Sequence, residues 1–228
     1  MHMTALDHGS RFFKTYAKDG DSIVDIGAQD VNGSLRSHAP VSAKYVGVDF
    51  VAGKGVDVVI DDPYCLPFED ELFDIAVSSS CFEHSEFFWL TFLEILRVLK
   101  PSGLLYLNVP SNGMYHRHPV DCWRFYPDSG KALERWARRN KFPCTMLESF
   151  TGPQNGGIFN DFVAVFVKDE IAVQGHADRM IYPGATNGFV FGSDELISPS
   201  EWPEDQRDDL TRRLRGIGQR VRSTFLGA

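Results

Sequence analysis

The sequence predicts an α/β protein built on a doubly wound parallel sheet. Short runs rich in Val, Ile, Leu and Tyr recur along residues 22–168, and stretches with helical spacing lie between several of them. Runs of that composition are typical of strands that are buried on both faces of a sheet. Their alternation with helices implies crossover connections, and therefore helices on both faces.

Seven strands are expected, each a run of five to nine residues. They span residues 22–26, 44–49, 56–60, 73–78, 104–109, 144–150 and 160–168. In open α/β sheets, ligands bind beyond the carboxyl ends of the strands. The loops that follow the individual strands are therefore where a functional site is expected.

Three helices are expected in the same region, at residues 7–19, 86–100 and 128–140. In the second of them, Leu93, Leu96 and Leu99 repeat at helical spacing. Pro101-Ser102-Gly103 follows and is expected to end that helix.

The composition changes beyond the α/β domain, which we place at residues 1–170. Residues 171–200 are rich in Gly, Pro, Ser and Asn, and are expected to form an irregular arm that could cover the site. Residues 201–228 are expected to form an amphipathic helix. Its narrow apolar stripe consists of Leu210, Leu214, Ile217, Val221 and Phe225.

Two roles are open for this C-terminal helix. Arginines surround its apolar stripe, so it could bind a partner helix or an anionic membrane surface. Alternatively, it docks on its own domain or pairs across a homodimer. Asp208 and Asp209 near its start weaken the membrane interpretation, and docking or dimerisation is favoured.

Charge and cysteine content narrow the class of protein. A net charge of -8 and an isoelectric point near 5.3 argue against general nucleic-acid binding, which requires a basic face. The four cysteines are widely spaced, as is typical of reduced thiols rather than of disulfides or a zinc site. No apolar run has the length of a membrane span. A cytoplasmic protein is expected.

The first strand ends in a turn that resembles a nucleotide-binding loop. Asp25-Ile26-Gly27 is followed by Gln29, where a dinucleotide-binding loop would have its second glycine, and the next glycine is Gly33. Asp49 ends the second strand, where a carboxylate can accept hydrogen bonds from ribose hydroxyls. A pyrophosphate needs closely spaced glycines, whereas S-adenosylmethionine carries no phosphate. The turn therefore favours S-adenosylmethionine over a nicotinamide cofactor.

Four motifs together resemble a known family. They are DIGAQDVNG, YVGVDF, LPFEDELFDIAVSSSCFEH and LEILRVLKPSG. In this order they are similar to the class I S-adenosylmethionine-dependent methyltransferases, in particular to the small-molecule branch with an LPF…FD…EH…RVLKPGG signature. The resemblance covers about residues 21–168. It implies a Rossmann-like, seven-stranded sheet with the last strand antiparallel, S-adenosylmethionine as cofactor, and methyl transfer as the activity.

The resemblance also implies a set of cofactor-binding residues. Asp25, Gly27 and Ala28 would line the methionine end, Asp49 and Phe50 would hold the ribose and flank the adenine, and Gly33, Asp62 and Ser80 complete the set. Pro63 follows Asp62 where the family often has a backbone N–H directed at the adenine, and proline has no N–H. The adenine contact could therefore shift from Asp62 to Asp61.

The segment 111–128 is the candidate acceptor site, because it directly follows the fifth strand. His118 is the first candidate for a general base, with Asp121 to orient its ring, and His116 and His84 follow. The candidate acceptor-binding residues are Tyr115, Arg117, Trp123, Arg124 and Tyr126. The alternative is a lid whose aromatic side chains only pack and whose charges are solvated.

No metal ion is expected at this segment. His116, His118 and Asp121 could in principle bind a divalent ion, but the segment lacks the clustered carboxylates that a hard cation prefers.

The expected reaction is O-methylation of a small polar acceptor. The His-Pro-Val-Asp…Trp-Arg-Phe-Tyr pattern of residues 118–126 is similar to sequences from glycan or secondary-metabolite assembly, which favours a sugar, a glycan or a secondary metabolite. Nucleic-acid bases are not expected, because the N/D-P-P-Y run of base amino-methylating enzymes is absent after the fourth strand. The alternatives are N-methylation of a small amine and a non-catalytic, cofactor-binding partner protein.

Overall fold

The computed structural model describes residues 3–154 and 159–201, which form one sheet with helices on both faces. The α-helices are α1 (Met3–Tyr16), α2 (Phe88–Val98) and α3 (Ser129–Arg139), and the 3₁₀ turns are η1 (Leu35–His38), η2 (Phe82–His84) and η3 (Glu170–Gly175). The strands are β1 (Ser22–Ile26), β2 (Lys44–Asp49), β3 (Val58–Val59), β4 (Phe73–Ser79), β5 (Leu99–Pro110), β6 (Thr145–Thr151), β7 (Asp161–Val167) and β8 (Thr186–Val190).

The sheet has the order β3-β2-β1-β4-β5-β7-β6-β8. The pairs from β3 to β5 are parallel, whereas β7 runs antiparallel between β5 and β6, and β8 runs antiparallel to β6. The strand order reverses between β1 and β4, and ligands of open α/β sheets bind at such a switch point. This places the ends of β1, β2, β4 and β5 around one candidate site.

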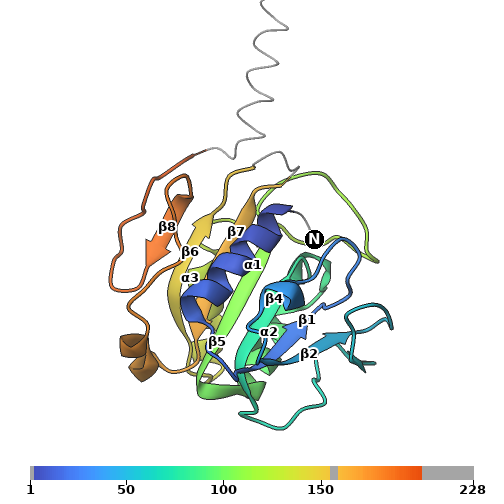
Figure 1. Ribbon diagram of the computed structural model, residues 1–228. Helices are drawn as coiled ribbons and strands as arrows, with labels where there is room; N and C mark the ends of the chain where they lie inside the picture. The colour runs from blue at the N-terminus through green and yellow to red at the C-terminus, as the bar shows by residue number, and fades with distance from the viewer. Residues whose placement is uncertain (1–2, 155–158, 202–228) are drawn as a thin grey trace, which may run out of the picture.

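Two apolar layers hold the helices against the sheet. Helix α1 covers one face of the sheet (Figure 1). On this face Phe12 and Phe13 of α1 pack with Tyr106 of β5. Phe92 of α2 packs with Leu105 on the opposite face, as expected because successive side chains of a strand alternate between faces. Each fully buried side chain of this size contributes roughly 1.5–3 kcal/mol. The predicted doubly wound, Rossmann-like architecture is confirmed.

Within the described residues, the sheet has eight strands instead of the seven expected. The eighth, β8, lies within residues 171–200, which the composition predicted to be irregular. Glu148 and Ser149 of β6 pair with Val190 and Phe189 of β8, and Phe189 is buried. Without β8, strand β6 would present an unpaired edge, so the added strand protects it. Two strands, β7 and β8, are therefore antiparallel.

Several element boundaries also differ from expectation. Helix α1 spans Met3–Tyr16 instead of residues 7–19. Helix α2 ends at Val98, and strand β5 already begins at Leu99, which pairs with Phe73. The expected strand at residues 56–60 is reduced to Val58–Val59. The predicted helix at 201–228 lies outside the described residues except for residue 201.

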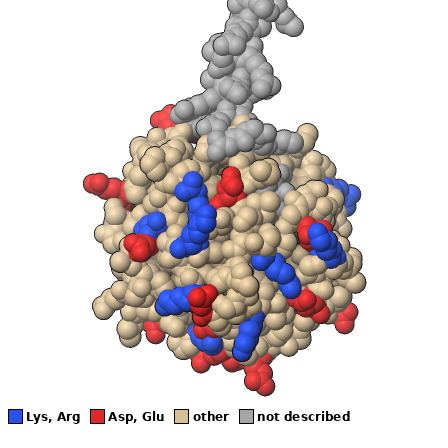
Figure 2. All heavy atoms as spheres, in the orientation of Figure 1, with Lys and Arg blue, Asp and Glu red and all other residues tan. Residues whose placement is uncertain are grey.

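The surface carries charges of both signs. On the face shown in Figure 2, Lys and Arg side chains lie among Asp and Glu side chains and form no continuous basic patch. Among the described residues, no helix is both long enough and apolar enough to span a membrane.

Candidate functional site

The turn after β1 requires a glycine at Gly27. Its backbone has φ +83°, a conformation that side chains disfavour, and its N–H donates to the carbonyl of Val48 over 2.9 Å. A Cβ atom at this position would lie 2.6 Å from the Cβ of Cys81. The turns after β1 and β4 therefore touch, and only a glycine allows it. Ala28 is buried in the same turn, and its N–H also donates to Val48.

Asp49 ties this turn to the end of β2. Its buried carboxylate accepts the backbone N–H of Gln29 over 3.1 Å and that of Val51 over 3.3 Å. The side chain of Gln29 packs over Gly53, where a Cβ would approach it within 2.7 Å. A carboxylate, rather than a second glycine, thus shapes the loop. Phe50 beside it is 50% exposed, which suits an aromatic side chain that flanks a ligand ring.

Asp25 lies buried in β1 and accepts a hydrogen bond from the hydroxyl of Tyr45 over 2.7 Å. Burial raises the pKa of this carboxyl to about 7, although the Tyr45 hydrogen bond and the Arg36 charge oppose the shift. The group therefore changes charge near neutral pH, next to the turn where the methionine end of a cofactor is expected.

Replacing Asp25 by asparagine should stabilise the protein increasingly as the pH rises. The pKa is higher in the folded than in the unfolded state, so the folded state binds more protons between about pH 4 and pH 7. The wild type loses stability across this window, by roughly 4 kcal/mol at most, and the variant does not. Urea unfolding at pH 5 and pH 8 measures the difference. An equal pH dependence in Asp25→Asn and in the exposed control Asp7→Asn would contradict the assignment.

The other predicted cofactor residues lie around the same turns. Gly33 donates its N–H to Asp30 and approaches Leu6 of α1. Ser80 follows β4 with φ +53°, and its N–H donates to the carbonyl of Asn108. Asp61 and Asp62 are both exposed, and Asp62 uses its carboxylate to accept the N–H of Tyr64 in a local turn. The local contact of Asp62 is compatible with the alternative in which Asp61 contacts the adenine.

Three histidines converge beyond β4 and β5. The ring of His84 lies 4.9 Å from that of His116 and 6.2 Å from that of His118, measured between ring centroids. His84 belongs to η2, whereas the other two come from the segment 111–128. Burial lowers the pKa of His84, so burial favours its neutral form.

Asp121 contacts a different histidine from the one predicted. Its carboxylate, 1% exposed, forms a two-point ion pair with Arg124, at 2.5 and 2.9 Å. It also accepts the backbone N–H of His116 and lies 3.4 Å from the Nδ1 atom of that residue. The Arg124 hydrogen bonds lower the pKa of Asp121 to about 2. The prediction that Asp121 orients the ring of His118 is wrong in the structure, because the pairing with Arg124 turns the carboxylate toward His116.

Glu83 is a site residue that the sequence analysis did not single out. It precedes His84 in η2 and is 1% exposed, and burial raises its pKa to about 8. The Glu-His pair after the fourth strand was the available signal. A buried pair also lies between α1 and β7, where the Nδ1 atom of His8 is 3.4 Å from the Asp161 carboxylate. This pair could not be predicted from the sequence, because the sequence does not show where α1 packs on the sheet.

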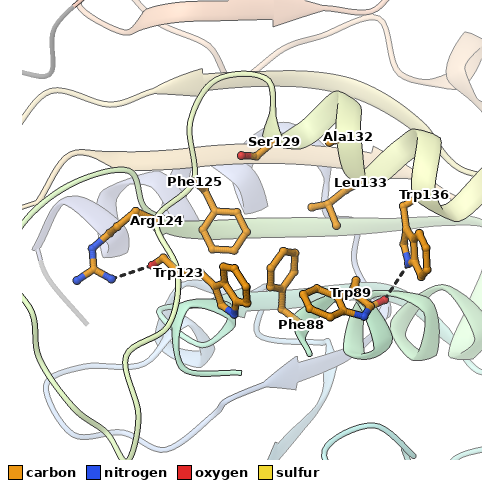
Figure 3. Close-up of a pocket in the computed structure, with 9 residues that line it drawn as sticks. All are labelled: Phe88, Trp89, Trp123, Arg124, Phe125, Ser129, Ala132, Leu133 and Trp136. Carbon is orange, nitrogen blue, oxygen red and sulfur yellow. Dashed lines mark hydrogen bonds between the residues drawn. The ribbon is translucent and has the colours of Figure 1, made fainter. Parts of the chain in front are cut away.

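An aromatic cavity of about 370 Å³ lies between α2, α3 and the end of the segment 111–128. Figure 3 shows its lining residues, which are Phe88, Trp89, Trp123, Arg124, Phe125, Ser129, Ala132, Leu133 and Trp136. Two of the predicted acceptor-binding residues, Trp123 and Arg124, are among them. Tyr115, Arg117 and Tyr126 are exposed and do not line it. The Trp123 indole donates to the carbonyl of Ser85, next to His84, and so connects the cavity to the cluster.

Comparison with known proteins shows what this part of the chain resembles. Residues 24–107 match the model of a methyltransferase domain. These residues are therefore similar to the methyltransferase domain family. The match contains all the predicted cofactor-binding residues, from Asp25 to Ser80, together with Glu83 and His84. The segment 111–128 lies beyond the match, so the family model does not describe the candidate acceptor site.

Individual relatives agree with this assignment. An uncharacterized methyltransferase of Mycolicibacterium paratuberculosis is 31% identical over 120 residues, which are 52% of this chain and 43% of that protein. The chain thus spans less than half of the length of this curated relative. The Burkholderia thailandensis 1,6-didemethyltoxoflavin-N1-methyltransferase, solved with S-adenosylhomocysteine, has a TM-score of 0.57 at 18% identity, over 73% of this chain and 79% of that chain.

A sarcosine dimethylglycine methyltransferase of Galdieria sulphuraria, described as putative, has a TM-score of 0.55 at 14% identity, over 73% of this chain and 86% of that chain. At these identities the likeness of the two solved structures establishes the methyltransferase fold.

Proposed function

We propose that the protein is an S-adenosylmethionine-dependent methyltransferase that acts on an oxygen of a small polar acceptor, such as a sugar, a glycan or a secondary metabolite. The family match of residues 24–107 supports methyl transfer. The site also fits the cofactor. A glycine turn without a pyrophosphate-binding pattern, the Asp49 carboxylate and the exposed Phe50 ring suit adenosine and methionine parts that carry no phosphate.

The observation that carries the choice of oxygen is the histidine cluster beyond β4 and β5. A hydroxyl acceptor must lose its proton as it attacks, and a positioned base contributes about 10²–10⁴-fold in rate. His116 and His118 are the two candidates, of which His116 contacts Asp121 and His118 is exposed. An amine acceptor would need no such base once it is neutral.

The chain's own residues then have three tasks. Bound S-adenosylmethionine supplies an electrophilic methyl group on a sulfonium. The aromatic cavity beside Trp123 holds an apolar part of the acceptor. Arg124 holds the segment that lines the cavity, because its guanidinium donates to Asp121 and to the carbonyls of Met114 and Trp123. A histidine accepts the hydroxyl proton while the oxygen–carbon bond forms and the carbon–sulfur bond breaks. Much of the remaining rate enhancement comes from positioning.

The proposal predicts transfer of labelled methyl groups from S-adenosylmethionine to hydroxyl compounds. Sugars, phenols and amines form the panel, and wild type, His116→Gln and His118→Gln are compared. We expect kcat to fall about 10²–10⁴-fold in the variant that lacks the base. His38→Gln is the control, because His38 is exposed in η1. Transfer to amines alone, with neither cluster histidine needed, would instead support N-methylation.

A further inference from the structure

Three side chains with metal-binding atoms converge at the histidine cluster. Glu83 and His84 come from η2, after β4, and His116 comes from the segment after β5. One ligand atom from each lies within 4.8 Å of the other two. Asp121, which is near His116 and His118 in the sequence, is not a member of this group, because its carboxylate is paired with Arg124.

Glu83 lacks a partner for one carboxylate oxygen. Its side chain is buried, and among the described residues its Oε2 atom has no hydrogen-bond partner. The other oxygen, Oε1, lies 3.7 Å from the Nε2 atom of His84, which is too far for a hydrogen bond. A buried carboxylate without a partner is costly, and a cation at this position would satisfy it.

Both histidines are held by their Nδ1 atoms. The Nδ1 atom of His84 hydrogen-bonds the carbonyl oxygen of Val120. That of His116 lies 3.2 Å from the carbonyl of Met114 and 3.4 Å from the Asp121 carboxylate. Metal-binding histidines usually direct one ring nitrogen at a carbonyl or carboxylate, which leaves the other nitrogen with a lone pair for the metal. In both rings that atom is Nε2.

We propose that Glu83, His84 and His116 bind one divalent transition-metal ion of the zinc type. Two imidazoles and one carboxylate are the protein ligands of several catalytic zinc sites, which keep further positions open. Ligand atoms about 2.1 Å from a tetrahedral ion lie about 3.4 Å from one another. A separation of 4.8 Å between two of these ligand atoms must therefore shorten by roughly 1.4 Å when the ion binds. The His116 side chain is 30% exposed, so it has room to make this adjustment.

The inference rests on the proposed function and refines it. The open position of the ion takes the acceptor hydroxyl oxygen and makes its proton more acidic. His116 is then a metal ligand, which leaves His118, with its ring 6.2 Å from that of His84, as the base. The hydroxyl proton passes to His118, the oxygen bonds to the methyl carbon, and S-adenosylhomocysteine leaves.

Metal binding is tested directly with Co²⁺ and Zn²⁺. The tag-free full chain is stripped with a chelator and titrated with Co²⁺, observed by visible absorption, and with Zn²⁺, observed by calorimetry. We expect one equivalent of either ion per chain. Loss of an outer-shell contact costs about 10–100-fold in metal affinity, so Glu83→Gln and His116→Ala should each weaken binding by more than about 100-fold. His38→Ala should bind as the wild type does.

Two results would overturn the site: no stoichiometric binding by the wild type, or unchanged affinity in both ligand variants. His116→Ala provides the safer test of the two, because that side chain is partly exposed and its loss should leave the fold intact. Binding of S-adenosylhomocysteine is measured on the same metal-free samples. Cofactor binding without metal binding would refute only the metal site, whereas metal binding without cofactor binding would refute the proposed function.

Discussion

Replacing Gly27 by alanine should abolish binding of S-adenosylhomocysteine and destabilise the fold. An alanine at position 27 would have to adopt φ +83°, and its Cβ would lie 2.6 Å from the Cβ of Cys81. The backbone conformation costs roughly 1–2 kcal/mol, and the overlap in a packed region adds about 1–3 kcal/mol. Relief of the overlap displaces the turn after β1, so we expect affinity to fall by more than about 100-fold. Urea unfolding and calorimetry measure the two effects.

Gly20 offers a matched control for Gly27. It has the same φ of +83°, but a Cβ there would have no atom within 4 Å. Gly20→Ala should therefore show the backbone cost alone and bind the cofactor normally. Adding Cys81→Gly to Gly27→Ala removes the overlapping Cβ and Sγ atoms and should restore part of both losses. Equal effects of Gly20→Ala and Gly27→Ala would show that contact between the two turns is unimportant.

Replacing Asp121 by asparagine should cost about 2–3 kcal/mol of stability at pH 7. Breaking a fully buried ion pair costs about 3–5 kcal/mol, and the 21% exposure of the Arg124 side chain reduces that figure. The pKa of Asp121 is about 2 when folded, lower than in the unfolded chain. The stability that the Asp121 carboxylate contributes is thus fully present above about pH 4 and is lost as the pH falls through 2. Urea unfolding at pH 7 and pH 3 should show the gap between variant and wild type narrowing.

The exposed pair of Asp70 and Arg97 is the control for Asp121. The Asp70 side chain is 74% exposed, so Asp70→Asn removes a solvated charge and should cost about 0–1 kcal/mol. Similar losses from Asp70→Asn and Asp121→Asn would contradict the view that burial makes the Asp121–Arg124 pair important for holding the acceptor segment.

The sequence sufficed to predict the parallel half of the fold and its cofactor turns. Strands β1 and β2 have the predicted bounds, because each is an apolar run that ends at an acidic residue or just beyond one. Asp49 and Gly27 meet at the turn because the carboxyl ends of neighbouring parallel strands share an edge. Strand β8 could not be predicted, because its residues form a strand only against the edge of β6.

The arrangement of the segment 111–128 depends both on a local side-chain pairing and on contacts with η2. The sequence shows that His116, His118 and Asp121 lie in one segment. It does not show which side chain the Asp121 carboxylate contacts. That choice follows from Arg124, which lies three residues later and reaches back to the carboxylate. Likewise, Glu83 becomes buried only when the segment 111–128 folds over η2, where the backbone N–H of Cys122 donates to the Glu83 carbonyl over 2.7 Å. Local sequence patterns do not reveal contacts that form when one segment packs over another.

Calorimetric titration of the full chain with S-adenosylhomocysteine, and separately with NAD, is the decisive test of which cofactor the turn after β1 binds. We expect saturable binding of one S-adenosylhomocysteine per chain, lost in Gly27→Ala and retained in Gly20→Ala, with no binding of NAD. Failure of S-adenosylhomocysteine to bind, or binding that survives Gly27→Ala undiminished, would contradict S-adenosylmethionine as the cofactor held by this turn.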